Sequence, residues 1–259
     1  MSAFVYEIVM RNNKKVCIFV DGENLRHSIG NLFPNFNRSD YLPVADWGNF
    51  FDWIACEVAG SNAERIRTYW YVVQNIDFAP FDLNSARKNA TYLTTLLSKD
   101  EYMRQVISDA QQEERNTLIQ KMADELQTGQ HILEKRFAGW TSIQNEIARK
   151  YDAIEFRRAG SIRYDLFKRE FGSEKAVDIK LATDLIKLKD MYDVAVIMSG
   201  DQDYVPAVEA IKDFGKHTVN VAFLTENDRL LPGGAKRLNQ STDWSIEVKH
   251  VDSKKHFFS

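Results

Sequence analysis

Two stretches of this 259-residue chain place acidic residues directly after an apolar run. VCIFVDGENL (residues 16–25) puts Asp21 after such a run, and VAVIMSGDQD (residues 194–203) does the same with Asp201 and Asp203. A continuous apolar run of this length is typical of a strand buried on both faces, as in parallel sheets covered by helices. In such sheets, ligands bind beyond the carboxyl ends of the strands. The two stretches therefore predict a parallel sheet with acidic side chains along one edge.

The rest of the sequence alternates between strand-like and helix-like patterns. The predicted strands are rich in β-branched and aromatic residues, and the predicted helices repeat apolar residues at helical spacing. Strands are predicted at residues 14–21, 65–73, 154–164, 193–200, 217–224 and 245–248, and helices at residues 46–59, 177–190 and 205–215. This alternation predicts the α/β class, with a mostly parallel central sheet covered on both faces.

Residues 82–150 depart from this alternation. They are polar, contain no strong strand pattern and repeat Leu, Ile and Met at helical spacing. We predict two or three helices here, forming a helical insertion in a single domain that spans residues 1–259. The apolar stripes of the insertion favour a packing surface, and a homodimer through the insertion or a sheet edge is a second reading.

Composition narrows the class of protein. The chain is 44% hydrophobic and 27% charged, which allows a sizeable core. Its net charge of -3 gives no global signal for nucleic acid, although a local basic patch is sufficient for binding. Two isolated cysteines, Cys17 and Cys56, form neither a disulfide framework nor a zinc site. No apolar run reaches membrane-spanning length, and the first residues lack the charge order of a secretory signal. We predict a soluble, cytoplasmic protein with no membrane partner.

Acidic residues from three separate segments form the candidate site. They are Asp21, Asp178, Asp201 and Asp203. Clustered carboxylates repel one another, so that their convergence favours a bound cation. Oxygen ligands without Cys or His indicate Mg²⁺ or Mn²⁺, which bind phosphate and activate water. Asn24 is placed to donate to a substrate phosphate or to steady Asp21.

Each acid also has a structural interpretation. A single Asp after a strand is more often a turn former or a helix N-cap. Asp178 and Asp203 could each cap the helix that follows, and Asp184, six residues after Asp178, projects from a different helix face. The occurrence of three such acidic segments in one chain is what favours a functional site.

Three motifs in this order resemble the signature blocks of the NYN domain, the LabA/DUF88 group of PIN-like nucleases. They are IFVDGENL (residues 18–25), KAVDIKLATDLI (residues 175–186) and VIMSGDQDYVPAVEAIKDFGKHTVNVAF (residues 196–223). The resemblance covers residues 15–75 and 154–250 and omits the insertion. It implies a Rossmann-like PIN/NYN fold and metal-dependent RNA cleavage.

Carried over position by position, the resemblance implies a role for each matching residue. The acidic metal site would comprise Asp21, Asp178, Asp201 and Asp203, with Asn24 as the amide after the first acid and Ser199 and Gly200 as the small residues before the last acids. The implied reaction is hydrolysis of RNA phosphodiester bonds with one or two Mg²⁺ or Mn²⁺ ions, endonucleolytic on single-stranded RNA.

A segment rich in basic and aromatic residues, 149–175, is the predicted substrate contact. Cationic side chains bind phosphates and aromatic faces stack on bases, which is how single-stranded RNA is bound. Five acids in the same segment favour ordinary surface salt bridges instead. The residues predicted to contact substrate are Asn24, Arg157, Arg158, Arg163, Lys180 and Ser199.

Two other functions are compatible with the sequence. A haloacid-dehalogenase-like phosphatase also places acids after strands, but its chemistry expects an acid, usually Asp, two residues after the nucleophilic Asp. Here Glu23 occupies that position and Asn24 follows, which fits the nuclease better. A non-catalytic RNA-binding regulatory module is the third reading. A dinucleotide enzyme is disfavoured because no G-x-G-x-x-G follows the first strand.

Overall fold

The structure is a computed structural model that describes residues 13–33, 41–80, 83–227, 229–230 and 236–257. The chain divides into two compact units. Unit 1 comprises residues 1–72, 142–159 and 176–259, and unit 2 comprises residues 73–141 and 160–175. Each unit is described separately below.

The described strands form one seven-stranded sheet in the order β4-β3-β2-β1-β5-β6-β7. The strands are β1 (Lys14–Asp21), β2 (Ala63–Ala79), β3 (Ile154–Asp165), β4 (Glu170–Lys175), β5 (Val194–Met198), β6 (His217–Phe223) and β7 (Trp244–Val248). β1 pairs in parallel with β2 and β5, the pairs β5–β6 and β6–β7 are also parallel, and β3 pairs with β4 in antiparallel orientation. The predicted α/β class with a mostly parallel sheet is confirmed.

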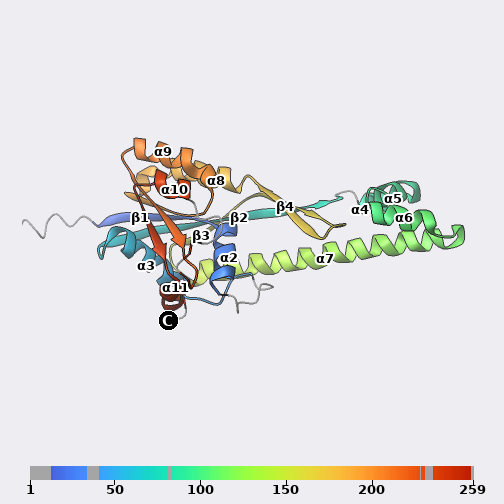
Figure 1. The fold of residues 1–259 in the computed structure, drawn as a ribbon, viewed down its shortest axis with the longest axis horizontal. Coiled ribbons are helices and arrows are strands. Elements are labelled where there is room, and N and C mark those ends of the chain that lie inside the picture. The colour runs from blue at the N-terminus through green and yellow to red at the C-terminus, as the bar shows by residue number, and fades with distance from the viewer. Residues whose placement is uncertain (1–12, 34–40, 81–82, 228, 231–235, 258–259) are drawn as a thin grey trace, which may run out of the picture. The chain divides into compact units, whose positions relative to one another are not determined.

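Helices cover both faces of the unit 1 strands. Figure 1 shows α8 (Val177–Lys187), α9 (Val205–Asp213) and α10 (Lys236–Ser241) on one side, and α3 (Trp47–Ala59) and α11 (His250–Phe257) on the other. Side chains of β1 therefore enter two cores: Val16, Ile18 and Val20 pack in the cluster that includes α3, whereas Phe19 contacts Tyr69 and Tyr192. The C-terminal segment forms α11, and its Phe257 is 1% exposed.

The turn from β1 into α2 (Gly22–Leu32) requires a glycine. A Cβ atom at Gly22 would lie 2.4 Å from the carbonyl oxygen of Tyr71 on β2, closer than any real side chain can approach. The lack of a side chain lets the helix begin directly at the end of the strand. Asp21 is therefore both the last residue of β1 and the N-cap of α2.

Unit 2 holds most of the predicted helical insertion. Its helices are α4 (Leu83–Ala86), α5 (Ala90–Leu97), α6 (Glu101–Asp109) and the part of α7 (Gln112–Lys150) up to residue 141. Leu and Ile residues of these helices form a separate apolar cluster with Leu166. The prediction of helices is confirmed, although the described residues form four, and α7 alone is 39 residues long.

Strand β4 was not predicted from the sequence. Its sequence, EFGSEK, is polar and almost entirely exposed, and it lies at the edge of the sheet. An edge strand with little buried surface has no apolar alternation to reveal it. In the part of the chain that the structure describes, no helix has the length and apolar character needed to cross a membrane.

Candidate active site

Asp21 lies at the centre of the candidate site and is 3% exposed. Its Oδ1 accepts a hydrogen bond from the backbone N–H of Asn24 at 3.1 Å. Its Oδ2 accepts hydrogen bonds from the Asn24 side-chain amide at 2.7 Å and from the Ser199 hydroxyl at 2.8 Å. The helix cap and the loop after β5 thus hold this carboxylate in one orientation.

Tyr204 joins Asp21 to Asp178. Tyr204 ends the short 3-10 helix η2 (Gln202–Tyr204) and is fully buried. Its hydroxyl lies 2.8 Å from Oδ1 of Asp178, in the first turn of α8, and 3.3 Å from Oδ2 of Asp21. A neutral tyrosine has one hydroxyl proton to donate, so the shorter contact is the better candidate for the donated bond. Acids from β1 and α8 therefore converge on one hydroxyl group.

The loop after β5 brings Asp201 to the same place. The Ser199 hydroxyl, which donates to Asp21, accepts a hydrogen bond from the backbone N–H of Asp201 at 3.0 Å. The backbone N–H of Gly200 donates to the side-chain oxygen of Asn24 at 3.1 Å. Asn24 therefore connects the ends of β1 and β5.

The two acids of the SGDQD segment differ in environment. Asp201 is half-buried, and its Oδ1 caps η2 by accepting from the backbone N–H of Asp203 at 2.9 Å. Asp203 is exposed, and among the described residues its carboxylate has no hydrogen-bond partner. Asp203 therefore contributes a solvent-accessible carboxylate two residues after Asp201, whose own carboxylate is held by the cap of η2.

Burial and the closeness of the acids shift the pKa values of two groups in the site, Asp21 and Tyr204. Burial raises the pKa of Asp21, and the charge of Asp178 raises it further, whereas hydrogen bonds from Asn24 and Ser199 act in the opposite direction. Burial and the charges of Asp21 and Asp178 also raise the pKa of Tyr204, which keeps its hydroxyl neutral and able to donate. Asp21 thus lies beside a second acid in a place with little access to water.

The candidate site offers carboxylate oxygens from two elements, Asp21 on β1 and Asp178 on α8, and oxygen ligands suit a hard divalent cation. Within the described ranges, no three His, Cys, Asp or Glu side chains are grouped closely enough to hold a metal ion. Asp21 and Asp178, with the hydroxyl groups of Ser199 and Tyr204 beside them, are the oxygen-bearing side chains that the structure brings together.

Two of the predicted substrate contacts have partners inside the protein. The Arg157 guanidinium pairs with Asp184 at 2.5 Å and lies 4.0 Å from the centre of the Tyr69 ring. Lys180 pairs with the other oxygen of Asp184 at 3.0 Å. Asp184 is 1% exposed and also accepts from the Tyr71 hydroxyl at 3.2 Å. Although burial alone would raise the pKa of Asp184, hydrogen bonds from Arg157 and Lys180 lower it.

Arg158 and Arg163, the other two predicted arginines, differ in their partners and lie in different units. Arg158, in unit 1, donates to the Gln144 side chain at 3.1 Å and to that of Asn145 at 2.8 Å. Arg163 belongs to unit 2, is exposed and has no ion pair with a described residue. The predicted basic segment is thus divided between the two units.

Sequence reasoning did not find the roles of Tyr204, Tyr71 and Asp184. Tyr204 follows Asp203 directly, but a single tyrosine gives no sign of which carboxylates its hydroxyl will reach. The four-residue spacing of Lys180 and Asp184 on a helix was an available signal for their ion pair.

A family model matches part of this chain. Residues 105–232 match the family model of the NYN domain. The matched range contains two of the three motifs, those with Asp178 and with Asp201 and Asp203, and the motif with Asp21 precedes it. None of the curated proteins matches this sequence.

One solved structure is similar to this chain. It is the crystal structure of a protein of unknown function from Vibrio parahaemolyticus RIMD 2210633, with 17% sequence identity and a TM-score of 0.42. The similarity covers 92% of this chain and 94% of that one.

Proposed function

We propose that this chain, which matches the NYN domain, a family of PIN-like nucleases, over residues 105–232, is a metal-dependent ribonuclease. Its reaction is the hydrolysis of phosphodiester bonds within single-stranded RNA. The observation that carries the proposal is the shared hydroxyl of Tyr204, which draws Asp21 and Asp178 together from distant parts of the sequence. Carboxylates gathered around a buried acid such as Asp21 repel one another, and a bound cation would compensate this repulsion.

NYN domains typically use divalent metal ions. In this chain Asp21, Asp178 and Asp201 would hold Mg²⁺ or Mn²⁺, and Asp203 supplies a further accessible carboxylate. Such a cation, when bound, offsets charge on the scissile phosphate and lowers the pKa of water. The residues around the acids keep the site ordered before any ligand arrives, which reduces the cost of assembling it.

Asn24 and Ser199 have positioning roles in this proposal. Both donate to Asp21, and each also contacts the backbone of the loop that carries Asp201. They thereby fix the orientation of one carboxylate and the path of the loop that presents the next. Their predicted contact with substrate remains part of the proposal.

The structure offers an observation against the phosphatase alternative. The acid two residues after Asp21 is Glu23, which pairs with Arg26 and lies 3.2 Å from His27. These hydrogen bonds outweigh burial and lower the pKa of Glu23 to about 2. Glu23 is therefore held as an ionised surface partner and is poorly suited to donate a proton to a leaving group.

The test is an RNA cleavage assay with wild type and Asp201→Asn. Asparagine keeps an oxygen that can accept from the Asp203 N–H, so the variant should fold with its η2 cap intact. A labelled single-stranded RNA is incubated with Mg²⁺, Mn²⁺ or EDTA, and p-nitrophenyl phosphate is tested in parallel. Wild type should produce internal fragments only with metal, and Asp201→Asn should produce none.

Three outcomes would contradict the proposal. Equal cleavage by a well-folded Asp201→Asn protein would remove this acid from the reaction. Hydrolysis of p-nitrophenyl phosphate without RNA cleavage would indicate a phosphatase. Binding of RNA by both proteins without cleavage by either would indicate a non-catalytic module.

A further inference from the structure

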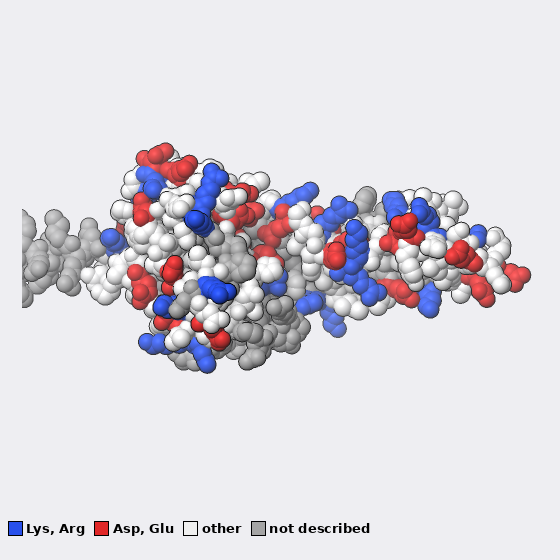
Figure 2. Space-filling view, in the orientation of Figure 1, with Lys and Arg blue, Asp and Glu red and all other residues white. Residues whose placement is uncertain are grey.

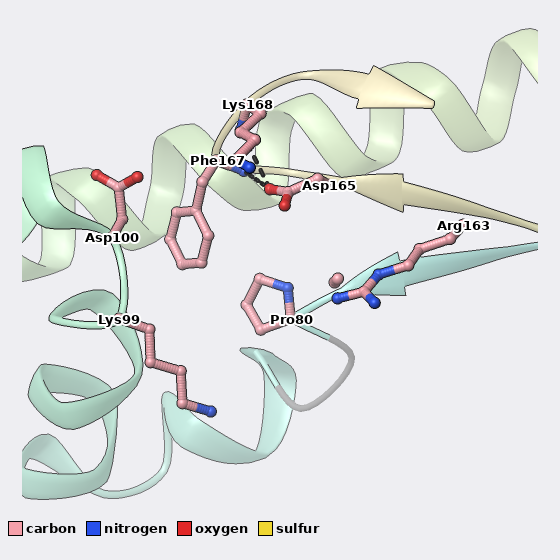
Figure 3. Close-up of a pocket in the computed structure, with 8 residues that line it drawn as sticks. Pro80, Lys99, Asp100, Arg163, Asp165, Phe167 and Lys168 are labelled. Carbon is pink, nitrogen blue, oxygen red and sulfur yellow. Dashed lines mark hydrogen bonds between the residues drawn. The ribbon is translucent and has the colours of Figure 1, made fainter. Parts of the chain in front are cut away.

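Unit 2 contains a pocket of about 330 Å³ that is lined by three cationic residues (Figure 3). They are Lys99, which follows α5, Arg163 on β3 and Lys168 in the turn between β3 and β4. Figure 3 shows the Phe167 ring and the side chains of Lys99 and Arg163 arranged around Pro80. The volume lies within the range of small-molecule sites, roughly 300–1,000 Å³.

The cationic side chains of this pocket form no ion pair with a described residue. Lys99, Arg163 and Lys168 are all exposed, and no ion pair joins them to a residue that the structure describes. Unpaired cations that face one pocket repel each other, and this repulsion is relieved when an anion binds between them.

The two acids of the pocket have structural roles. Asp100 caps α6, because its Oδ1 accepts from the backbone N–H of Met103 at 2.9 Å. Asp165 closes the turn after β3, because its Oδ1 accepts from the backbone N–H groups of Phe167 at 3.0 Å and Lys168 at 3.1 Å. Both carboxylates stabilise backbone, and neither forms an ion pair with a cation of the pocket.

A second hollow continues from the first. Its volume is about 730 Å³, and it shares Ala79 and Arg163 with the smaller pocket. Lys175 also lines it, and Asp77 on its wall accepts a hydrogen bond from the Ser161 hydroxyl. Arg163 therefore lines both hollows, and their volumes are larger than a single ion requires.

This cationic character is local. Figure 2 shows acidic and basic side chains interspersed on the visible face of the molecule, in agreement with the net charge of -3. A ligand attracted here is thus recognised by the pocket and not by the charge of the whole protein.

We propose that these two hollows bind a segment of single-stranded nucleic acid, with phosphates at Lys99, Arg163 and Lys168 and a base against the ring of Phe167. Phosphate contacts from cations combined with a stacking ring are the usual means of binding an unpaired strand. An acidic peptide without aromatic residues would satisfy the cations but would not stack on the ring of Phe167, which is half-buried against the apolar cluster of unit 2. That the strand is RNA rests on the proposed function, whereas the phosphate chemistry rests on the pocket.

The test is a salt titration of RNA binding, with every protein carrying Asp201→Asn so that cleavage does not interfere. The pocket variant is Lys99→Ala, Arg163→Ala and Lys168→Ala. The matched control, Lys88→Ala, Lys121→Ala and Lys135→Ala, removes the same charge from exposed residues of unit 2 that do not line either hollow. A neutral variant, Phe167→Leu, removes the ring alone.

The pocket variant should raise the Kd for a labelled single-stranded RNA by about tenfold or more, since three charge-assisted contacts are lost. The slope of the logarithm of the binding constant against the logarithm of the salt concentration should become less steep by roughly 0.7 per lost contact, about 2 in total. Phe167→Leu should raise the Kd about fivefold while leaving the salt slope unchanged, because stacking releases no counterions. The control variant should change both quantities far less.

Unchanged affinity and slope in the pocket variant would overturn the inference, and so would equal losses in the pocket and control variants. Tighter binding of polyglutamate than of RNA would overturn it in favour of an acidic protein partner. The result is separable from the proposed function: loss of binding in the pocket variant supports the inference even where wild type cleaves no RNA. Conversely, cleavage by wild type stands even where the pocket variant binds RNA normally.

Discussion

Two arginines of the same strand, Arg157 and Arg163, have opposite environments. Arg157, in unit 1, is paired with the buried Asp184 and stacked on Tyr69. Arg163, in unit 2, is exposed and forms no ion pair with a described residue. In sequence they were equal candidates for binding RNA. The comparison teaches that the function of a basic side chain depends on whether the fold supplies its anion.

The charged groups of the two units also differ in whether they have partners inside the protein. The acids of unit 1 are connected through Tyr204, Ser199 and Asn24 before any ligand binds. The cations that line the unit 2 pocket have no such connections within the described chain. We infer that unit 1 is organised for chemistry and unit 2 for holding a strand.

The largest expected effect comes from removing the arginine that has a partner. Arg157→Ala should lower the free energy of unfolding by about 3 kcal/mol, because it leaves the 1%-exposed carboxylate of Asp184 with fewer partners. This is the low end of the usual range, since Lys180 still pairs with Asp184. Urea denaturation followed by circular dichroism measures the change.

Arg163→Ala is the matched control for that variant. It removes an exposed side chain without an ion pair, so its free energy of unfolding should stay within about 0.5 kcal/mol of wild type. Similar destabilisation by the two substitutions would remove the structural basis of the comparison.

A glycine substitution should have the next largest effect. Gly22→Ala places a Cβ atom 2.4 Å from the Tyr71 carbonyl oxygen, so that either β2 or the start of α2 must shift. The free energy of unfolding should fall by about 1–3 kcal/mol, as in overpacked cores. Since Gly22 follows Asp21, cleavage should fall as well, and a variant with wild-type stability would show that the two segments are less closely packed than described.

The ion pair of Arg157 and Asp184 should also show in the pH dependence of the free energy of unfolding. The pKa of Asp184 is lowered in the folded state from its ordinary value of 3.8. Its contribution to stability is therefore complete above that value and is lost as the pH falls through the lower folded pKa. Below pH 4, the unfolding free energy of wild type should decline more steeply than that of Asp184→Asn, by up to about 1.4 kcal/mol per pH unit. Parallel curves would mean that Asp184 gains nothing from Arg157.

The smallest expected effect is a stabilisation in unit 2. Gly129 lies on α7, and a Cβ atom added there would meet nothing within 4 Å. Gly129→Ala should therefore raise the free energy of unfolding by about 0.5–1 kcal/mol through helix propensity alone. A loss of stability in thermal melts would indicate that this face of α7 has a partner in solution.

Much of unit 1 could be predicted from the sequence because its strands are buried on both faces. The apolar runs before Asp21 and Asp201 mark β1 and β5, and the acids at their ends lie at one edge as expected. Long-range pairings, in contrast, leave little local trace. The Tyr204 bridge and the partners of Arg157 depend on which segments the sheet brings together. The exposed strand β4 lacked any hydrophobic period.

The most direct test of the division between the two units is single-turnover cleavage of one RNA at increasing concentrations of excess protein. Asp178→Asn, in unit 1, should lower the plateau rate and leave the half-saturating protein concentration near that of wild type. The pocket variant of Lys99, Arg163 and Lys168 should raise the half-saturating concentration about tenfold and leave the plateau rate near that of wild type. A lowered plateau with unchanged half-saturation in the pocket variant, or the reverse in Asp178→Asn, would contradict the account.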